Sequence, residues 1–405
     1  MANKKICILG LGYIGLPTSV LLANRGYCVH GVDVVQSTVD AINTGKPHIV
    51  EPDLDAFLDL AVKSGKFKAS LAPENADVFI IAVPTPFHNG YVPNIEYVMN
   101  ATKSIAPYIR DDCMVILEST SPVGTTNMVE NTLKICGVDI SKIFVAYCPE
   151  RVLPGHIMKE LIENDRIVGG TRSESTKIIA DFYREFVHGE VLETDAKTAE
   201  MTKLTENSFR DTNIAFANEI SMLCDKFDIN VWELIRLANR HPRVEILKPG
   251  AGVGGHCIAV DPWFIVHSSQ ETARLIKTSR EVNNNKTEWV IEKIKNKAIL
   301  FESENNRKPK IACMGLTFKP DIDDLRESPA LYISKRITDE IVNVVCVEPN
   351  IPLSCHLSTI NNKLKLEKLE EALVTADLIV FLVAHKEFRN LNIENALDFC
   401  GVLNS

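Results

Sequence analysis

The sequence lacks the features that mark membrane, secreted and nucleic-acid-binding proteins. No apolar run reaches the roughly 20 residues that a membrane-spanning helix needs. No signal peptide is indicated, because the first residues run directly into a short strand-like segment at Ile6–Leu9. The formal net charge is -9 and no basic run occurs, which argues against a nucleic-acid partner. We therefore expect a cytoplasmic protein that uses neither a membrane nor a nucleic acid.

The cysteines lack a pattern as well. The chain has 11 of them, an odd number, and no Cys-x-x-Cys pair. Such scatter does not fit a disulfide framework and favours reduced thiols, most of which serve as small core residues. No metal site is predicted.

A glycine pattern is the first positive signal. Gly10, Gly12 and Gly15 stand in the spacing G-x-G-x-x-G, between the apolar run at Ile6–Leu9 and an apolar helix predicted for Leu16–Asn24. The first glycine allows a tight turn, the second lets backbone amides approach a pyrophosphate, and the third lets helix pack on strand. Asp33 follows the next strand, where a carboxylate accepts the ribose hydroxyls of NAD and repels the extra phosphate of NADP.

Three further strands with polar ends continue this first lobe. They are expected within residues 76–86, 113–124 and 143–155. Ligands of such sheets bind beyond the carboxyl ends of the strands, so Thr85, Thr120 and Glu150 should face one crevice. The alternative is that each side chain only satisfies the backbone of its own loop.

A long helix is predicted for residues 195–227, which contain neither glycine nor proline. At 100° per residue, Lys203, Asn207 and Arg210 fall within about 60° of one another on its surface. This arc is either part of an active site or an ordinary solvated face.

A second, smaller α/β lobe follows a polar stretch, Glu302–Lys310, which we interpret as a linker. Its first strand, Ile311–Leu316, ends in a turn with Gly315 alone, so no second dinucleotide is expected there. With 405 residues, 45% of them hydrophobic, the chain can form two or three domains with buried cores. We predict an α/β fold with two Rossmann-like doubly wound lobes joined by a central helical domain with a long helix. The predicted boundaries are 1–194 (NAD-binding), 195–302 (central helical) and 303–405 (C-terminal, with a loop suited to phosphate or ribose contacts).

Cys257 lies in the segment KPGAGVGGHCIAVDP, a loop rich in glycine and proline. A thiol is useful to a nicotinamide enzyme when an aldehyde product is oxidised again, because the thiolate adds to it and a thioester can then form. His256 and Lys203 are candidate cations that lower the pKa of the thiol, and Asp261 is a candidate for orienting or deprotonating water. The glycines are expected to let sugar and nicotinamide approach the sulfur. The alternative is a buried structural thiol in a glycine turn.

Six motifs in this order resemble the UDP-glucose/GDP-mannose dehydrogenase family over the whole chain. They are GLGYIG from Gly10, STSPVGTT from Ser119, PERVLPG from Pro149, AEMTKLTEN from Ala199, GVGGHCIAVDP from Gly252 and GLTFKPDIDDLRESP from Gly315. The resemblance implies a four-electron oxidation of a sugar C6 alcohol to a carboxylate with two NAD, through a thiohemiacetal and a thioester on Cys257. It also implies a UDP-sugar substrate and a homodimer.

The resemblance carries roles to individual residues. It makes Cys257 the nucleophile, Lys203 and Asn207 the pair that holds oxyanion and water, and Asp261 the acid beyond the cysteine. Thr120 and Glu150 match water- and substrate-binding positions, and Arg243 resembles an arginine lent across a dimer interface. The implied NAD contacts are Gly10, Gly12, Tyr13, Ile14, Gly15, Asp33, Thr85, Thr120, Thr126 and Arg326. The implied substrate contacts are Arg151, Val152, Lys203, Asn207, Arg210, His241, Arg243, Gly254, Phe318 and Lys319.

Two departures from the UDP-glucose branch point to the N-acetylhexosamine branch. The nucleophile stands in HCIAVD rather than SCFPKD, and Pro154 replaces a second glutamate. The resemblance then implies UDP-N-acetyl-D-mannosamine as substrate, with UDP-N-acetylglucosamine and UDP-glucose as alternatives. Two other classes stay open on the residues alone: a two-electron Rossmann dehydrogenase and a non-catalytic NAD-binding module.

Overall fold

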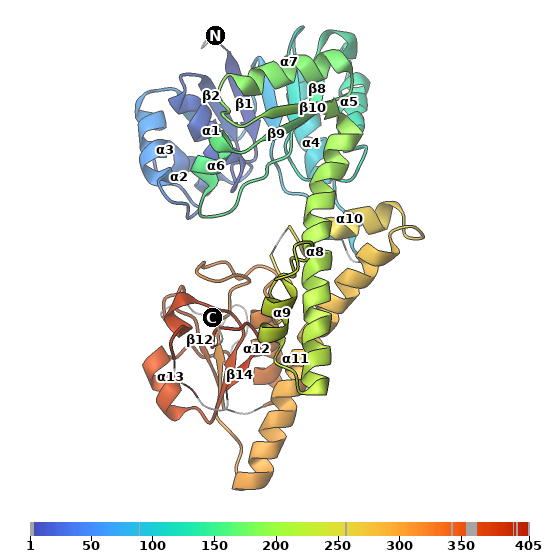
Figure 1. Ribbon diagram of the computed structural model, residues 1–405. Coiled ribbons are helices and arrows are strands. Elements are labelled where there is room, and N and C mark those ends of the chain that lie inside the picture. Colours follow the sequence, from blue (N-terminus) through green and yellow to red (C-terminus); the bar gives the residue numbers. More distant parts are fainter. Residues whose placement is uncertain are drawn as a thin grey trace. The chain divides into compact units, whose positions relative to one another are not determined.

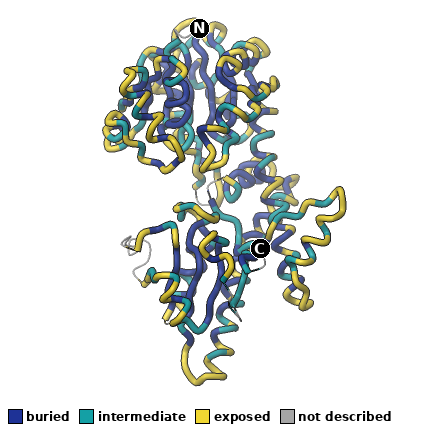
Figure 2. The backbone as a smooth tube through the Cα atoms, turned by 60° about the vertical axis from the view of Figure 1, so that its left-hand side comes forward, coloured by how far each residue is buried: buried dark blue, intermediate teal, exposed yellow. Residues whose placement is uncertain are grey.

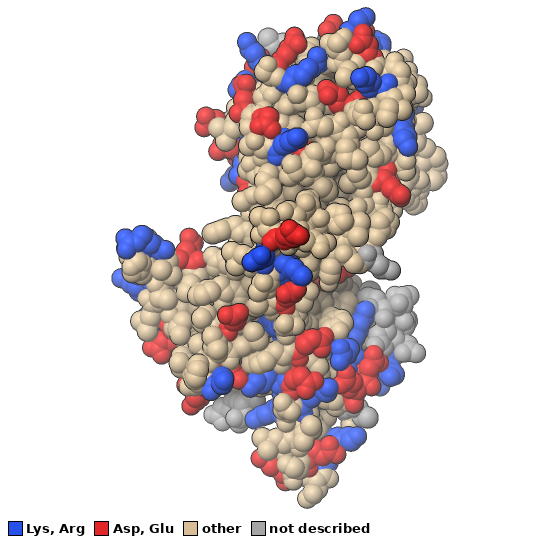
Figure 3. Space-filling model, turned by 90° about the vertical axis from the view of Figure 1, so that its right-hand side faces the viewer, with Lys and Arg blue, Asp and Glu red and all other residues tan. Residues whose placement is uncertain are grey.

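The protein divides into two compact units in the computed structural model. The described residues are 4–88, 90–255, 257–341, 343–353, 363–391, 393 and 396–403. Unit 1 comprises Met1–Glu206 and Trp263–Ser268, and unit 2 comprises Asn207–Pro262 and Ser269–Ser405. Figure 2 shows buried strands at the centre of each unit. On the face drawn in Figure 3, charged side chains of both signs are mixed.

Unit 1 is built on an eight-stranded sheet with the order β10-β9-β8-β7-β4-β1-β2-β3. Its strands are β1 (Lys5–Leu9), β2 (Cys28–Val32), β3 (Phe67–Ser70), β4 (Val78–Ile81), β7 (Met114–Leu117), β8 (Phe144–Tyr147), β9 (Arg166–Gly170) and β10 (Val191–Asp195). The six strands from β3 to β8 in this order pair in parallel. Strands β1, β4 and β7 are nearly continuous apolar runs because helices cover both faces of the sheet.

Helices lie on both faces of this sheet, as the predicted doubly wound fold requires. They are α1 (Gly15–Asn24), α2 (Gln36–Asn43), α3 (Leu54–Lys63), α4 (Glu96–Ile105), α5 (Thr125–Ile135), α6 (Ile157–Glu163) and α7 (Ser173–Arg184). Side chains of α1, α2, α3, α6 and α7 share one hydrophobic core, and those of α4 and α5 share the core on the other face. Short elements complete the unit: β5 (Phe87–His88), β6 (Val92–Pro93), η1 (Ala106–Tyr108) and η2 (Ile140–Lys142).

The last two strands run in the opposite direction. Strand β9 pairs antiparallel with β8, and β10 pairs parallel with β9. Helix α8 (Ala196–Phe227) begins directly after β10, with no residue between them. Because β10 is reversed, α8 starts at the edge where the parallel strands begin and runs toward the edge where they end (Figure 1).

Unit 2 contains the rest of α8 and a four-stranded parallel sheet with the order β12-β11-β13-β14. The strands are β11 (Ile311–Met314), β12 (Val344–Val347), β13 (Leu378–Phe381) and β14 (Leu397–Asp398). The remaining elements of unit 2 are α9 (Val231–Ala238), α11 (Arg274–Asn305), α12 (Pro329–Glu340), α13 (Leu369–Thr375) and η4 (Lys386–Phe388). Helix α10 (Asp261–Ser268) begins with two residues of unit 2 and continues in unit 1 from Trp263. Helices α11 and α12 pack on one face of the sheet, and α13 and η4 on the other.

The predicted linker Glu302–Lys310 is partly wrong. Helix α11 continues through Asn305 and ends at Asn306, whose φ of 53° is left-handed. Val290, Ile291, Ile294 and Ala298 hold the helix against the core, so its last turn stays helical although its side chains are polar. The other predicted helices and strands lie where expected, within a few residues at their ends. The domain boundaries at 194/195 and 302/303 stay predictions.

Candidate active site

The glycine turn after β1 has the geometry that its sequence predicts. Gly10 has a φ of 90°, and a Cβ there would lie 2.5 Å from the carbonyl oxygen of Ala82. A Cβ on Gly15 would lie 1.8 Å from the carbonyl oxygen of Gly10, so the helix packs too closely for any side chain. A Cβ on Gly12 would meet nothing within 4 Å. The first and third glycines are therefore required by packing, and the second leaves open space for a ligand beside the exposed backbone.

Asp33 lies at the end of β2 and faces this turn. Its Oδ2 accepts a hydrogen bond from the Leu11 amide at 3.1 Å, and Oδ1 accepts one from Val35 at 3.0 Å. The carboxylate is thus held beside the turn. Tyr13 and Ile14, in the same turn, are half-buried.

Two predicted hydroxyl contacts have partners within the chain. The Thr85 hydroxyl donates to the carbonyl oxygen of Thr120 at 2.6 Å, so it contacts the loop after β7 rather than the backbone of its own loop. Thr126 is fully buried, and its hydroxyl and amide both donate to Oε1 of Glu200 on α8, at 2.6 and 2.7 Å. The structure joins Thr85 to Thr120, and it gives Thr126 a role in docking α8 onto the sheet. Their contacts with a cofactor stay predictions.

Glu150 follows β8 and is 7% exposed. Its Oε2 lies 2.8 Å from the buried guanidinium of Arg166 on β9, and its Oε1 accepts from the Arg151 amide at 2.7 Å. Nearby, burial raises the pKa of the Glu118 carboxyl to about 7, and the Tyr183 hydroxyl donates to Glu118 at 2.7 Å. The ion pair with Arg166 therefore fixes the Glu150 carboxylate in an apolar setting.

Helix α8 holds the loop after β8 by two contacts. Lys203 donates from Nζ to the carbonyl oxygen of Glu150 at 2.7 Å. Arg151 pairs with Glu206 at 2.8 Å, and Val152, next to it, is half-buried against the sheet core. Three residues implied as substrate contacts, Glu150, Arg151 and Lys203, are thus brought together within unit 1.

Asn207 and Asp261 form the central contact of unit 2. Asn207 follows Lys203 by four residues on α8, so both side chains leave the same face of the helix. The Asn207 amide donates to Oδ2 of Asp261 at 2.5 Å, and the two side chains are 8% and 3% exposed. The two residues lie 54 positions apart in the sequence, and only the fold brings them into contact.

Cys257 lies one turn before α10 and is exposed. Its carbonyl oxygen accepts from the amides of Val260 and Asp261 at 3.0 and 2.8 Å, which starts the helical turn. The amides at a helix start favour a thiolate over a thiol. The alternative, a buried structural thiol, does not fit this exposure. His256, the other cation candidate, lies outside the described residues.

The glycines before Cys257 pack against the chain itself, which differs from our expectation that they admit ligands. A Cβ on Gly254 would lie 2.4 Å from the carbonyl oxygen of Glu327, and one on Gly255 would lie 2.8 Å from the Phe318 ring. Gly252, with a φ of 143°, would place a Cβ 2.3 Å from the Thr287 hydroxyl. Glycine is needed at these three positions because the loop packs directly against Thr287, Glu327 and Phe318.

Two buried side chains anchor the start of this loop. Asn218 on α8 accepts from the Gly250 amide at 2.9 Å, and Thr287 on α11 donates to the carbonyl oxygen of Ala251 at 3.1 Å. Asn218 also donates to Asn283, which donates to Asp211, and Asp211 pairs with Arg280 at 2.6 Å. Sequence reasoning missed this buried chain of polar groups, because its members read as ordinary polar positions of two long helices.

A pocket of about 300 Å³ lies within unit 2 beside the anchored loop. Its lining residues come from five segments: Lys248, Pro249, Gly250, Ala251, Gly252; Thr317, Phe318, Pro320; Pro329, Ala330; Leu382, Val383, Ala384, Arg389; and Cys400, Gly401. Of the residues implied as substrate contacts, Phe318 lines it directly. Arg389, a cation on its wall, was not predicted.

Other predicted residues lie at the surface of unit 2. Arg210 is exposed on α8, and His241 and Arg243 are exposed after α9, where Arg243 donates its amide to Nδ1 of His241 at 3.3 Å. Arg326 pairs with Asp324 at 2.6 Å. Their predicted roles as substrate or cofactor contacts are not tested by these positions.

Known sequences match the chain along almost its whole length. Models of one family match three stretches, as the NAD binding domain (residues 4–187), the central domain (197–285) and the UDP binding domain (312–400). The chain belongs to the UDP-glucose/GDP-mannose dehydrogenase family. The family membership predicted from the six motifs is confirmed, and the reading as a non-catalytic module is wrong.

Individual members of the family are similar over the full chain. The UDP-N-acetyl-D-mannosamine dehydrogenase of Campylobacter jejuni is 54% identical over 410 residues, covering 98% of this chain and 99% of the relative. That of Escherichia coli K12 is 50% identical over 409 residues, covering 98% and 97%. An NDP-N-acetyl-D-galactosaminuronic acid dehydrogenase of Ralstonia nicotianae is also 50% identical, over 399 residues, covering 96% and 92%.

Solved structures of the family share the fold. The UDP-D-ManNAc dehydrogenase of Pyrococcus horikoshii superimposes with a TM-score of 0.89 at 36% identity, covering 98% of this chain and 96% of that one. The UDP-N-acetyl-mannosamine dehydrogenase of Staphylococcus aureus gives 0.85 at 39% identity, covering 99% and 95%. The predicted fold class of Rossmann-like lobes is confirmed.

This family member is an NAD-dependent nucleotide-sugar dehydrogenase. The residues of unit 1 fit NAD, since the open space at Gly12 suits a pyrophosphate and Asp33 at the end of β2 suits ribose hydroxyls. Within the described part of the chain, no helix is both long enough and apolar enough to cross a membrane.

Proposed function

We propose that the enzyme oxidises C6 of UDP-N-acetyl-D-mannosamine by four electrons, giving UDP-N-acetyl-D-mannosaminuronate. Support for the sugar comes from the relatives of that name in Campylobacter jejuni and Escherichia coli, at 54% and 50% identity over nearly the full chain. The structures of that name from Pyrococcus horikoshii and Staphylococcus aureus add to it.

One observation carries the four-electron reaction. Cys257 is exposed at the start of a helical turn that ends at Asp261, and Asp261 is buried and held by Asn207. A dehydrogenase that stops at the aldehyde needs no nucleophile of this kind. A thiolate beside a fixed carboxylate and amide supplies the groups that a second oxidation and a hydrolysis require.

In the first oxidation, the C6 hydroxyl loses its proton and C6 loses a hydride. NAD, when bound, supplies the hydride acceptor for both oxidations. Lys203 is proposed to accept the hydroxyl proton as a neutral amine, and its Nζ is positioned by a hydrogen bond to the carbonyl oxygen of Glu150. Asn207, one helical turn further along α8, is proposed to donate a hydrogen bond to the oxygen at C6.

In the second oxidation, the Cys257 thiolate adds to C6 of the aldehyde. A carbon–sulfur bond forms, and the oxygen takes up a proton to complete the thiohemiacetal. Loss of that proton and a second hydride gives the thioester. Water then adds to C6 and the carbon–sulfur bond breaks. One proton of the water is taken up in the site and the other passes to solvent, which leaves the carboxylate product and restores the thiolate. Asp261 is proposed to orient that water and accept its proton, and Thr120 and Glu150 are proposed to assist in binding it.

The pocket of about 300 Å³ in unit 2 is proposed to receive the uridine diphosphate. Phe318 offers a flat apolar surface for the base, and Lys248 and Arg389 offer cations for the diphosphate. Lys319 and Gly254 adjoin this pocket in sequence. Arg151, Val152, Arg210 and His241 stay proposed contacts of the sugar portion.

The protein is proposed to form a homodimer through α8. Phe209, Phe216 and Leu223 follow one another at seven-residue spacing and are 68%, 51% and 42% exposed. Seven residues are nearly two helical turns, so these side chains form one apolar stripe. A second copy of the helix would cover it, and Arg243 would then serve the site of the second copy. In light scattering, the wild type should have the mass of a dimer and Phe216→Asp the mass of a monomer. The same mass for both proteins would overturn this proposal.

A second sugar is favoured by one specific observation. The Ralstonia nicotianae relative, named for N-acetyl-D-galactosaminuronic acid, is as similar to this chain as the Escherichia coli enzyme. UDP-N-acetylgalactosamine is therefore the main rival substrate.

The test is the number of NADH released per sugar consumed. UDP-N-acetylmannosamine should give two, and UDP-N-acetylgalactosamine, UDP-N-acetylglucosamine and UDP-glucose should give little turnover. Two NADH from another of these sugars would overturn the substrate assignment but keep the mechanism. Cys257→Ala should abolish acid formation, and Cys136→Ala, which alters another exposed thiol, should not. One NADH per sugar in the wild type would overturn the thiol mechanism.

A further inference from the structure

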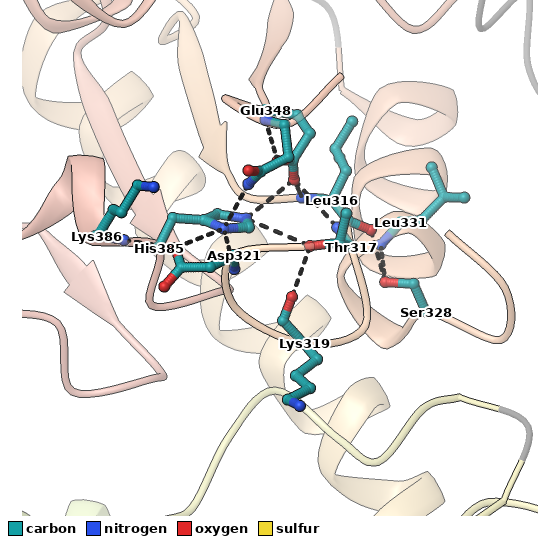
Figure 4. A network of polar contacts seen from close by, with 10 residues as sticks. Leu316, Thr317, Lys319, Asp321, Ser328, Leu331, Glu348, His385 and Lys386 are labelled. Atoms are coloured by element: carbon teal, nitrogen blue, oxygen red, sulfur yellow. Dashed lines mark hydrogen bonds and ion pairs between the residues drawn. The ribbon is translucent and has the colours of Figure 1, made fainter. Parts of the chain in front are cut away.

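The loop that carries Phe318 and Lys319 lies between β11 and α12. Phe318 lines the pocket of unit 2 and packs under Gly254 and Gly255 of the cysteine loop. Figure 4 shows the Lys319 side chain pointing away from the polar groups that surround the base of the loop. What holds the loop backbone therefore decides where these two side chains lie.

His385, which follows β13, holds one side of this loop. It is fully buried. Its Nδ1 lies 3.0 Å from the backbone amide of Asp321 and 3.0 Å from the side-chain amide of Asn350 (Figure 4). A backbone amide can only donate, so Nδ1 carries no proton. The ring proton is on Nε2, which lies 3.1 Å from Oε2 of Glu348.

Glu348, just beyond β12, holds the other side. Its Oε2 accepts from the amides of Leu316 and Thr317 at 2.7 and 3.2 Å, and its Oε1 accepts from Asn350 at 3.0 Å. Both oxygens of Glu348 accept hydrogen bonds from groups that can only donate, so neither carries a proton. A buried, ionised carboxylate thus depends on the His385 proton for one of its bonds.

This arrangement resembles the glycine turn of unit 1, except that the carboxylate is buried. There, Asp33 beyond β2 accepts from the Leu11 amide beside Gly10. Here, Glu348 beyond β12 accepts from the Leu316 amide beside Gly315, whose φ of 94° matches that of Gly10. Asp33 is partly exposed, whereas the Glu348 side chain is fully buried beside His385. The chain's own imidazole occupies the side of the turn where a ligand would bind.

A metal does not explain this cluster. Asp321, His385 and Glu387 place potential ligand atoms within 4.8 Å of one another. However, Nδ1 of His385 already accepts two hydrogen bonds, and its Nε2 carries the proton that faces Glu348. The imidazole has no lone pair left for a cation.

We propose that neutral His385 is a positioning residue for nucleotide recognition. It ties the loop at Asp321 directly and at Leu316 and Thr317 through Glu348. Thr317 in turn donates from its hydroxyl to the carbonyl oxygen of Lys319 at 2.9 Å. The backbone on both sides of Phe318 is thereby fixed before the ligand arrives, so binding costs less ordering of the loop. This inference rests on the proposed binding of UDP beside Phe318.

The test measures UDP affinity by calorimetry in the full-length protein, separately from turnover. His385→Phe removes the hydrogen bonds of both ring nitrogens and should raise the Kd for UDP at least about tenfold, with the Kd for NAD and kcat at saturating UDP-sugar within about twofold of wild type. His385→Asn keeps an acceptor near the position of Nδ1 and should recover part of the affinity. Lys386→Ala is the matched control, since only its backbone amide contacts Asp321.

Glu348→Gln keeps the shape of the side chain but weakens its bonds to the loop amides. It should raise the Kd for UDP severalfold, and it provides the measurement if His385→Phe does not fold. Wild-type Kd values for UDP in both variants would overturn the inference. A merely structural role would lower stability and impair NAD and UDP binding together, which would also overturn it. Failure of the wild type to bind UDP would instead contradict the proposed function.

Discussion

The Asn207 amide donates to the Asp261 carboxylate at 2.5 Å, and both side chains are almost fully buried. This bond links α8 to the turn that begins at Cys257. Asn207 thereby fixes the Asp261 side chain from outside the cysteine loop.

Asn207→Asp should make the pair depend on pH. Two carboxylates at this distance cannot both be ionised, so the pKa of one must rise in the folded state. The stability that this proton supplies is fully present below the unfolded pKa of about 4 and is lost as pH rises through the raised folded pKa. We expect a melting temperature that falls with rising pH relative to wild type, and a kcat at least about 100-fold lower at pH 8.

Asn230→Asp is the control for this substitution. It makes the same charge change at the N-cap of α9, where aspartate caps as well as asparagine. A pH-independent difference between Asn207→Asp and wild type would contradict the prediction.

Asp33→Ala should weaken the preference for NAD. The carboxylate faces the turn at Leu11, where the adenosine ribose of NAD is expected, and it would repel the phosphate of NADP. Loss of a charged hydrogen bond of about 1.5–3 kcal/mol corresponds to a roughly 10- to 100-fold lower kcat/KM with NAD. The ratio of kcat/KM values for NAD and NADP should fall. Asp40→Ala, on the exposed face of α2, should leave that ratio unchanged.

Thr287→Val should weaken UDP binding without touching the ligand. Valine matches threonine in shape but cannot donate to the Ala251 carbonyl, which the loop start needs. An unpaired buried carbonyl costs about 1–3 kcal/mol, and part of that cost should appear as a fivefold or greater rise in the Kd for UDP, at roughly 1 kcal/mol per fivefold. Thr287→Ser keeps the hydroxyl and serves as the control. Equal Kd values for the two variants would contradict a role for this bond.

Glu118→Gln should change how stability depends on pH. Burial raises the pKa of Glu118 to about 7, above its usual value of about 4.5. Stability from the bound proton is complete below about pH 4.5 and is lost as pH rises through about 7. As pH rises from about 4.5 to 7, the free energy of unfolding of the glutamine variant should therefore increase by up to about 3 kcal/mol relative to that of wild type. The difference in melting temperature measured across this range tests it, with Glu174→Gln at an exposed position as control.

Local features were predictable from the sequence, and contacts between distant segments were not. Gly10, Gly15 and Asp33 belong to one consecutive strand–helix–strand unit (β1, α1 and β2), so their spacing determines their geometry. Lys203 and Asn207 were singled out by helical periodicity. Their partners Glu150 and Asp261 lie more than 50 residues away and are joined to them only by the fold.

Buried polar groups were the hardest to foresee. His385 and Glu348 lie in short loops after two different strands, and nothing in the residues around them distinguishes them from surface positions. The same holds for Asn218 and Thr287. The polar end of α11 was misread as a linker because polar composition indicates only exposure, whereas apolar residues two to four turns earlier stabilise the helix.

The direct junction of β10 and α8 restricts how the length of this chain can vary in evolution. One inserted residue after Asp195 would turn the helix by about 100° and advance it by about 1.5 Å. Within unit 1, Glu200 would lose Thr126 and Lys203 would lose Glu150 in a single event. Homologous chains should therefore tolerate insertions and deletions in surface loops while keeping a constant count of residues between the end of β10 and Lys203.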